Sequence, residues 1–285
     1  MRLSAKNAVI TGASQGLGLA IAREFLREGA NVAICGRHAA DLERAAESLK
    51  GEGAGRILHA VADVSREPDV DAFADYCQHE VGGTDVLVCN AGMYGPKGSI
   101  EDIDWLEWRR AIDVNLMGAV YCCRAFLPQL SRSSRAKIIL LSGGGATKPL
   151  PYLSAYAASK AALVRFGETL AEELKPKGIN VNMLAPGALN TRMLDEVIEA
   201  GPERVGAAYH AAALNQKRTG GSPLEQAAAL CTYLAGPDSH GITGRLISAV
   251  WDPWEKLDRI AEALAGTDIY TLRRIVPEDR GKAWS

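Results

Sequence analysis

The stretch Ala8-Val9-Ile10-Thr11-Gly12-Ala13-Ser14-Gln15-Gly16-Leu17-Gly18 decides the fold of this 285-residue chain. Three apolar residues predict a short buried strand, and the glycines after them predict a tight turn into a helix. Leu17, Ile21 and Phe25 then recur every four residues, as on the buried face of a helix. A strand, a glycine-rich turn and a helix in this order are typical of a site where helix N–H groups bind a pyrophosphate. A tight turn without a ligand is the alternative.

Further apolar runs rich in Val and Ile alternate with segments of helical period. These runs cover residues 32–34, 57–61, 86–88, 138–141 and 179–184. Because each run is apolar throughout, we expect strands that are buried on both faces of a parallel sheet. The pattern predicts one α/β domain with a doubly wound, mostly parallel sheet, helices on both faces and a ligand site at the carboxyl ends of the strands.

Composition excludes several classes of protein. The 32 Lys and Arg nearly balance the 34 Asp and Glu, for a net charge of -2, so we expect no nucleic-acid partner. No apolar run approaches the roughly 20 residues that cross a bilayer, and the start has no signal-peptide pattern. We therefore expect a cytoplasmic protein without a membrane partner. The six cysteines form no C-x-x-C pair and the five histidines are scattered, so we expect neither a metal nor disulfides.

A candidate acid/base pair lies in the segment 154–163. On a helix, Tyr156 and Lys160 are four residues apart and share one face. A free phenol has a pKa of about 10, which is too high for easy proton exchange at neutral pH, and an adjacent ammonium favours the phenolate. We predict that Tyr156 is the acid/base and that Lys160 lowers its pKa. A surface Tyr–Lys pair is the alternative.

Three motifs together resemble the short-chain dehydrogenase/reductase family: T-G-x-x-x-G-x-G at 11–18, N-A-G at 90–92 and Y-x-x-x-K at 156–160. The resemblance covers residues 6 to about 250. It implies a Rossmann-type catalytic domain over 1–250, with a substrate lid at 190–223, in a homo-oligomer that is a dimer or a tetramer. The implied reaction moves hydride between a nicotinamide and a ketone or secondary alcohol. The implied partner is therefore a small carbonyl or alcohol substrate.

The resemblance also assigns the cofactor site. Gly36 stands where NAD-selective sheets usually carry a carboxylate, and Arg37 can pair with a 2′-phosphate, so we expect NADP(H) rather than NAD(H). A solvated Arg37 is the alternative, and Asp63 could instead cap the next helix. The implied cofactor-binding residues are Gly12, Ser14, Gln15, Gly16, Leu17, Gly18, Arg37, Asp63, Val64, Asn90, Ala91, Gly92, Tyr156, Lys160, Pro186, Gly187 and Thr191.

One position departs from the family pattern. The family's carbonyl-orienting serine falls at Gly143, one residue after Ser142. Either Ser142 turns into the site, or a backbone N–H of the glycines 143–145 binds the substrate oxygen. Asn115 resembles the family's asparagine that supports a proton-relay water, with a buried, backbone-capping Asn as the alternative. The predicted catalytic residues are Tyr156, Lys160, Asn115 and Ser142.

Gly143 keeps two other functions open. One is a redox-neutral epimerase or dehydratase with bound cofactor, and the other is a weakly active NADP(H)-binding sensor or scaffold. The basic side chains of the lid could meet an acidic substrate or be solvated; they are Arg192, Arg204, Lys217 and Arg218.

Residues 251–285 form a C-terminal extension outside the motifs. Trp254, Leu257, Ile260, Ala261 and Leu264 have a spacing near that of an amphipathic helix. We expect the extension to pack on its own domain or on a neighbouring subunit.

Overall fold

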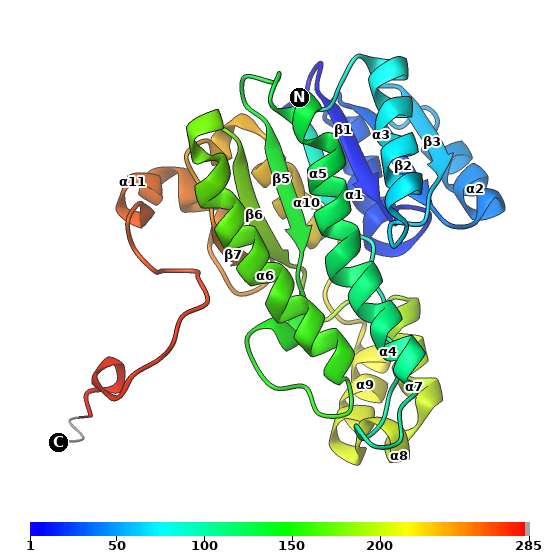
Figure 1. Ribbon diagram of the computed structural model, residues 1–285, viewed down its shortest axis with the longest axis vertical. Helices are drawn as coiled ribbons and strands as arrows, with labels where there is room; N and C mark the ends of the chain where they lie inside the picture. The colour runs from blue at the N-terminus through cyan, green and yellow to red at the C-terminus, as the bar shows by residue number, and fades with distance from the viewer. Residues whose placement is uncertain (283–285) are drawn as a thin grey trace.

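A seven-stranded parallel sheet forms the centre of the computed structural model, which describes residues 1–282 (Figure 1). The strand order is β3-β2-β1-β4-β5-β6-β7, so the direction of sheet growth reverses between β1 and β4. This confirms the predicted doubly wound sheet, in which ligands bind where the order reverses. The strands are β1 (Asn7–Thr11), β2 (Asn31–Gly36), β3 (Ile57–Val61), β4 (Val86–Cys89), β5 (Lys137–Leu141), β6 (Asn180–Ala185) and β7 (Arg245–Ser248).

Helices cover both faces of the sheet and bury its apolar side chains (Figure 1). One face packs against α1 (Gly16–Arg27), α2 (Ala39–Leu49) and α10 (Leu224–Ala235), and the other against α3 (Glu67–Val81), α5 (Gly118–Leu130) and α6 (Ser154–Leu174). A helix α4 (Trp105–Ile112) leads through the π-helical turn η1 (Asp113–Met117) into α5. Short 3₁₀ turns lie at η2 (Gly144–Ala146), η3 (Lys175–Lys177) and η4 (Pro237–Ser239). Within residues 1–282, no helix has both the length and the apolar character needed to cross a membrane.

Three helices stand apart at the carboxyl end of the sheet (Figure 1). They are α7 (Arg192–Ala200), α8 (Pro202–Val205) and α9 (Ala207–Thr219), called here the lid helices. They have an apolar cluster of their own, the lid cluster, which consists of Leu194, Val197, Val205 and Ala213.

Strand β3 corrects the expectation that every strand is buried on both faces. It pairs only with β2 and forms one edge of the sheet. His59 and Val61 are exposed, Val61 by 57%. An edge strand has only one neighbouring strand, so apolar sequence alone overestimated its burial.

The C-terminal extension does not form the predicted amphipathic helix. It begins as a 3₁₀ helix, η5 (Trp254–Ile260), and continues as the short α11 (Ala261–Leu264). Trp254 and Leu257 are buried in the same core cluster as α1 and α10, whereas Ile260 is 41% exposed. Three residues per turn bring Trp254 and Leu257 onto one face, which explains the apolar spacing without a long α-helix.

The extension then runs along the outer edge of β7. The N–H of Leu246 donates to the carbonyl of Tyr270 at 2.8 Å. The buried guanidinium of Arg245 donates to three carbonyls of the extension, those of Leu264 (2.6 Å), Thr267 (2.8 Å) and Ile269 (2.6 Å). This segment therefore satisfies the Leu246 N–H at the outer edge of β7 and is fastened beside the strand by the Arg245 side chain.

Beyond Leu272 the chain leaves the body of the protein (Figure 1). The N–H of Leu272 donates to the carboxylate of Glu168 on α6 at 2.6 Å. Residues 273–282, called here the C-terminal arm, contain the 3₁₀ turn η6 (Pro277–Arg280). Within residues 1–282, the hydrogen bonds and salt bridges of the arm all go to residues 268–282. The last three residues of the predicted extension, 283–285, lie outside the described residues.

Candidate active site

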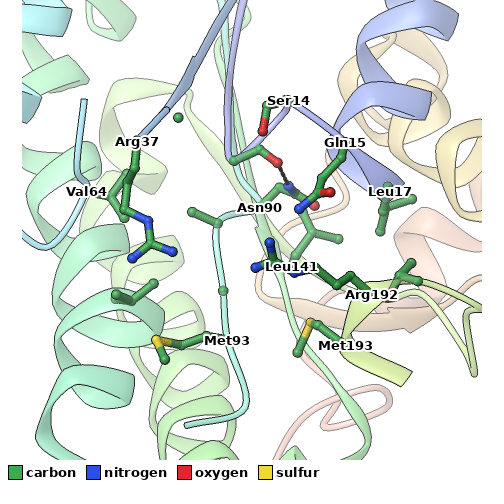
Figure 2. Close-up of a pocket in the computed structure, with 18 of the residues that line it drawn as sticks. Ser14, Gln15, Leu17, Arg37, Val64, Asn90, Met93, Leu141, Arg192 and Met193 are labelled. Carbon is green, nitrogen blue, oxygen red and sulfur yellow. Dashed lines mark hydrogen bonds between the residues drawn. The ribbon is translucent and has the colours of Figure 1, made fainter. Parts of the chain in front are cut away.

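A cavity of about 450 Å³ lies at the carboxyl ends of β1, β2, β4 and β5 (Figure 2). Every cofactor-binding residue predicted from the sequence lines it except Gly187. The residues concerned are Gly12, Ser14, Gln15, Gly16, Leu17, Gly18, Arg37, Asp63, Val64, Asn90, Ala91, Gly92, Tyr156, Lys160, Pro186 and Thr191.

The glycine turn after β1 is locked against the segment that follows β4. Gly12 has a φ of +64°, and a β-carbon there would lie 2.7 Å from the Cα of Ala91. The side-chain amide of Asn90 donates to the carbonyls of Thr11 (2.9 Å) and Gly12 (3.0 Å). Figure 2 shows one of these bonds as a dashed line. Helix α1 begins at Gly16, on the cavity wall. Bare backbone and a helix N-terminus on one wall fit a dinucleotide pyrophosphate.

Arg37 and Asp63 stand at another part of the cavity. The Arg37 side chain is exposed, lies near Val64 in Figure 2 and forms no salt bridge within residues 1–282. Asp63 accepts hydrogen bonds from the Ser65 N–H (3.0 Å) and hydroxyl (2.7 Å). Burial opposes the charge on Asp63, but these bonds and then the charges of Arg37 and Arg110 lower its pKa below the usual value. Asp63 therefore shapes the turn before α3 while it also lines the cavity.

Tyr156 and Lys160 lie together on α6, and both are buried. The Lys160 Nζ donates to the carbonyl of Leu141 at 2.7 Å and lies 5.8 Å from the centroid of the Tyr156 ring. Burial lowers the pKa of Lys160 to about 8, an effect that Cys89 partly opposes. Burial, with a contribution from Tyr209, raises the pKa of Tyr156. The prediction that this pKa is lowered is therefore wrong for this structure, because burial dominates and the ammonium bonds a backbone carbonyl.

Asn115 lies in the π-helical turn η1 and is only 1% exposed. Its side chain accepts from the Met93 N–H (2.8 Å) and donates to the Met93 carbonyl (2.8 Å) and to Ser159 (2.9 Å). A β-carbon at Gly92 would lie 3.3 Å from the Asn115 oxygen and 3.5 Å from the Lys160 Nζ. Asn115 thus lies behind the cavity wall, where it fixes the backbone after β4 against α6.

Ser142 and Gly143 follow β5 directly. The Ser142 hydroxyl is buried, belongs to a residue of the cavity lining and has no hydrogen-bond partner within residues 1–282. A β-carbon at Gly143 would clash with the Tyr156 hydroxyl oxygen. The phenol therefore occupies the volume in which a side chain at position 143 would begin.

Some lining residues escaped the sequence reasoning. Most of them adjoin a predicted residue along the chain, so a wider window around each motif would have found them. Gly187, in contrast, was predicted to bind the cofactor but does not line the cavity. Its φ is +89°, and a β-carbon there would lie 2.6 Å from the Val250 side chain, so Gly187 allows close packing. Within residues 1–282, no group of three His, Cys, Asp or Glu side chains is placed to hold a metal ion. Gly36 and Arg192, which the sequence analysis named in other roles, also line the cavity, and the missed lining residues are His38, Asp41, Ala62, Met93, Val114, Leu141, Leu189, Asn190 and Met193.

Comparison with known proteins places this geometry in a family. The family model described as short chain dehydrogenase matches residues 6–201. The chain is 39% identical over 249 residues to 3beta-hydroxysteroid dehydrogenase 1 of Eggerthella lenta, covering 85% of this chain and 91% of the relative.

Two solved structures with bound NADPH are also similar. L-sorbose reductase from Gluconobacter frateurii, complexed with NADPH and L-sorbose, has a TM-score of 0.78 and 30% identity over 87% of this chain and 97% of its own. A short chain oxidoreductase from Pseudomonas aeruginosa, described as containing an atypical catalytic center, has a TM-score of 0.77 and 29% identity over 88% of this chain and 98% of its own. With the parallel sheet and the glycine turn, these matches show that the chain belongs to the short-chain dehydrogenase/reductase family and is an oxidoreductase acting on alcohol and carbonyl groups.

Proposed function

We propose that this chain uses NADP(H) to interconvert a ketone and a secondary alcohol, with Tyr156 as the acid/base. The observation that carries the proposal is that Tyr156 and Lys160 line the same cavity as the glycine turn and Arg37. Bound nicotinamide would supply or accept the hydride at the reacting carbon, and the protein would position the substrate and move the proton.

Tyr156 would exchange the proton with the substrate oxygen. Its buried phenol is neutral at physiological pH, because burial raises its pKa, so it is ready to donate during carbonyl reduction. Lys160, with a pKa of about 8, is largely charged at neutral pH, and its charge would offset part of the cost that burial imposes on the phenolate left behind. Asn115 would support proton relay through its hold on Met93 and Ser159, which set the wall beside Lys160.

Ser142 would supply the second hydrogen bond to the substrate oxygen. Its hydroxyl is buried without a partner, and an unpaired buried hydroxyl is costly unless a ligand satisfies it. The related P. aeruginosa structure with an atypical catalytic center supports the idea that the family tolerates a changed site.

NADP(H) is favoured by Gly36 and Arg37. No carboxylate stands at the end of β2 to repel a 2′-phosphate, and the unpaired guanidinium of Arg37 can bind one with two parallel N–H groups. The two similar structures that bind NADPH are consistent with this choice.

The proposal extends to the rest of the predicted organisation. The lid helices, within 190–223, would close over the substrate, and the extension from 251 would pack on the domain or on a neighbouring subunit of a dimer or tetramer in the cytoplasm. The buried Trp254 and Leu257 support packing on the domain itself.

The test is NADPH consumption over a panel of ketones, with Tyr156→Phe beside the wild type. Consumption that requires both the substrate and Tyr156 is the expected result. Tight NADPH binding without any consumption would contradict the proposal and favour the redox-neutral reaction or the sensor. A product that forms without net change in the cofactor would identify the redox-neutral reaction.

A further inference from the structure

Tyr94 connects the proposed acid/base to the lid. Its ring packs edge-on against the ring of Tyr156, with the centroids 4.7 Å apart and the planes at 62°. Tyr94 also packs against the lid cluster, as does Tyr209 of α9. Burial raises the pKa of Tyr94, and its neighbours Tyr156 and Tyr209 raise it further, so this phenol is neutral. Tyr94 thus lies between Tyr156 and the lid cluster, next along the chain to Met93 of the cavity lining.

The surroundings of Tyr94 are mostly apolar. Met93 and Met193 stand at the same end of the cavity, one from the loop after β4 and one from α7 (Figure 2). After β5, the three glycines 143–145 carry no side chain, but the Tyr156 hydroxyl fills the space at Gly143 and Ala157 fills the space at Gly145. The aromatic and thioether side chains at this end of the cavity offer contacts to a flat apolar group.

Charged side chains near the lid are balanced or already paired. Lys217 pairs with Asp195 at 2.7 Å, and Arg192 pairs with Glu196 at 3.5 Å. Lys97, whose Nζ lies 5.7 Å from the centroid of the Tyr94 ring, also pairs with Glu196, at 3.4 Å. These three cations share two carboxylates, Asp195 and Glu196, so each already has an acidic partner within the protein.

A second, open cavity of about 490 Å³ adjoins Lys97, and it does not favour an anion either. Its charged lining contains two cations and two carboxylates: Lys97, Arg204, Glu196 and Glu199. An acidic substrate would meet as many negative as positive side chains here, so this lining offers its carboxylate no net positive charge to offset the cost of desolvation.

We propose that Tyr94 determines substrate specificity, and that the substrate is an uncharged ketone or secondary alcohol with an apolar ring at the reacting carbon. This inference rests on the proposed function and deepens it. The ring would stack against Tyr94 while its oxygen meets Tyr156.

Two probes of nearly equal shape test the substrate class. They are 4-methylcyclohexanone and 4-oxocyclohexanecarboxylate, which differ by a methyl group in place of a carboxylate. Fructose serves as an uncharged but polar comparison. With the wild type and NADPH, kcat/KM for the methyl ketone is expected to exceed that for either other compound by about tenfold or more, the usual scale for one apolar contact.

Variants then test Tyr94 itself. Tyr94→Phe keeps the ring and is expected to keep the preference. Tyr94→Ala is expected to lower kcat/KM for the methyl ketone about tenfold, mainly through KM, and to leave kcat/KM for fructose, which has no apolar ring, unchanged. Tyr152→Ala is the matched control, because Tyr152 is 42% exposed and its ring lies against Gly206 rather than Tyr156. Unchanged NADPH binding and Tm in each variant show that the fold is intact.

The possible failures are distinguishable. Tyr156-dependent turnover that favours the carboxylate probe or fructose would overturn this inference and leave the proposed function standing. Equal losses for all three compounds in Tyr94→Ala would also overturn it. A wild type without Tyr156-dependent turnover would overturn the proposed function and this inference with it.

Discussion

Gly143 and Tyr156 compete for one volume: a β-carbon on Gly143 would lie 2.0 Å from the tyrosine hydroxyl oxygen and 2.9 Å from the ring carbon that bears it. Contacts below 3.0 Å do not occur between real β-carbons and their neighbours, so any side chain at position 143 would displace the phenol. The glycine is therefore tied to the place of Tyr156 as well as to the missing serine.

Gly143→Ala is expected to lower kcat about tenfold to 100-fold, because a displacement of about 1 Å at a reacting group has an effect of this size. The Tm is expected to change little, since the hydroxyl lies at the end of a side chain that can rotate away. Gly144→Ala is the control, because a β-carbon there would meet nothing within 4 Å. Steady-state kinetics decide the matter, and equal kcat values for the two variants would refute the prediction.

Gly36→Asp is expected to change the cofactor preference from NADP(H) towards NAD(H). A β-carbon at Gly36 would meet Leu42 at 3.5 Å and Ser14 at 3.6 Å, which are ordinary contacts, so the fold should accept it. The new carboxylate would repel a 2′-phosphate and bind a ribose hydroxyl. Fluorescence titrations are expected to show NADPH affinity falling about tenfold and NADH affinity rising.

Arg37→Ala is the companion variant for the cofactor. It is expected to weaken NADPH binding and leave NADH binding unchanged, because NADH has no 2′-phosphate for the guanidinium to bind. If both dinucleotides weakened equally in either variant, the assignment of Gly36 and Arg37 to the 2′-phosphate would be lost.

We expect Lys160→Met to raise the free energy of unfolding of the cofactor-free protein, by an amount that depends on pH. The pKa of Lys160 is lowered from 10.5 to about 8 on folding, with burial as the main cause. Below pH 8 the lysine is charged in both states, so the cost of burying the charge is fully present. Between pH 8 and 10.5 only the unfolded state keeps the proton, so wild-type stability rises relative to the variant.

The stability difference between Lys160→Met and wild type should therefore be largest at pH 7 and shrink by about 3 kcal/mol towards pH 10.5. Lys137, whose pKa burial also lowers to about 8, is present in both proteins and cancels. Urea unfolding at pH 7, 9 and 10 measures the difference. Parallel stability curves for the two proteins would show that the Lys160 charge is not buried at a cost.

Two changes in the extension should lower the free energy of unfolding by very different amounts. Leu257 is fully buried, so Leu257→Ala is expected to cost about 2–5 kcal/mol. Deleting 273–285 removes the C-terminal arm, whose polar contacts stay within the extension, and is expected to cost less than about 0.5 kcal/mol. Thermal and urea unfolding check both. A large loss on deleting the arm would mean that it anchors the domain after all.

Assembly and kinetics of the same truncated protein test the proposed subunit contact. If the arm reaches a neighbouring subunit, light scattering should show a smaller assembly or the KM should change. Full assembly with unchanged kinetic constants would rule out that role for the arm.

Most of the cavity lining was predictable because its residues are read locally. The glycine turn, N-A-G and Tyr156–Lys160 are each contiguous, and the ends of neighbouring parallel strands bring them to one cavity. The contact between Tyr94 and Tyr156 was not predictable, because the two rings are 62 residues apart along the chain and only the packing of the loop after β4 against α6 joins them.

Burial explains the predictions that were wrong. The pattern of Tyr156 and Lys160 indicates proximity, but the direction of a pKa shift depends on how much water each group loses. Likewise, the apolar run of β3 does not reveal that the strand lies at an edge. The spacing from Trp254 to Leu264 fits a 3₁₀ turn as well as an α-helix, and only packing against α1 and α10 decides between them.

The cover that residues 264–272 place on β7 has a consequence for the protein in concentrated solution. An uncovered outer strand presents free N–H and C=O groups that can pair with a strand of another molecule. The carbonyl of Tyr270 accepts from one such group here, the Leu246 N–H, and the Arg245 side chain holds the segment in place through its bonds to three carbonyls of residues 264–269. The segment thus protects the edge of the sheet from pairing with another molecule. Its loss is expected to cause precipitation of protein whose domain is still folded.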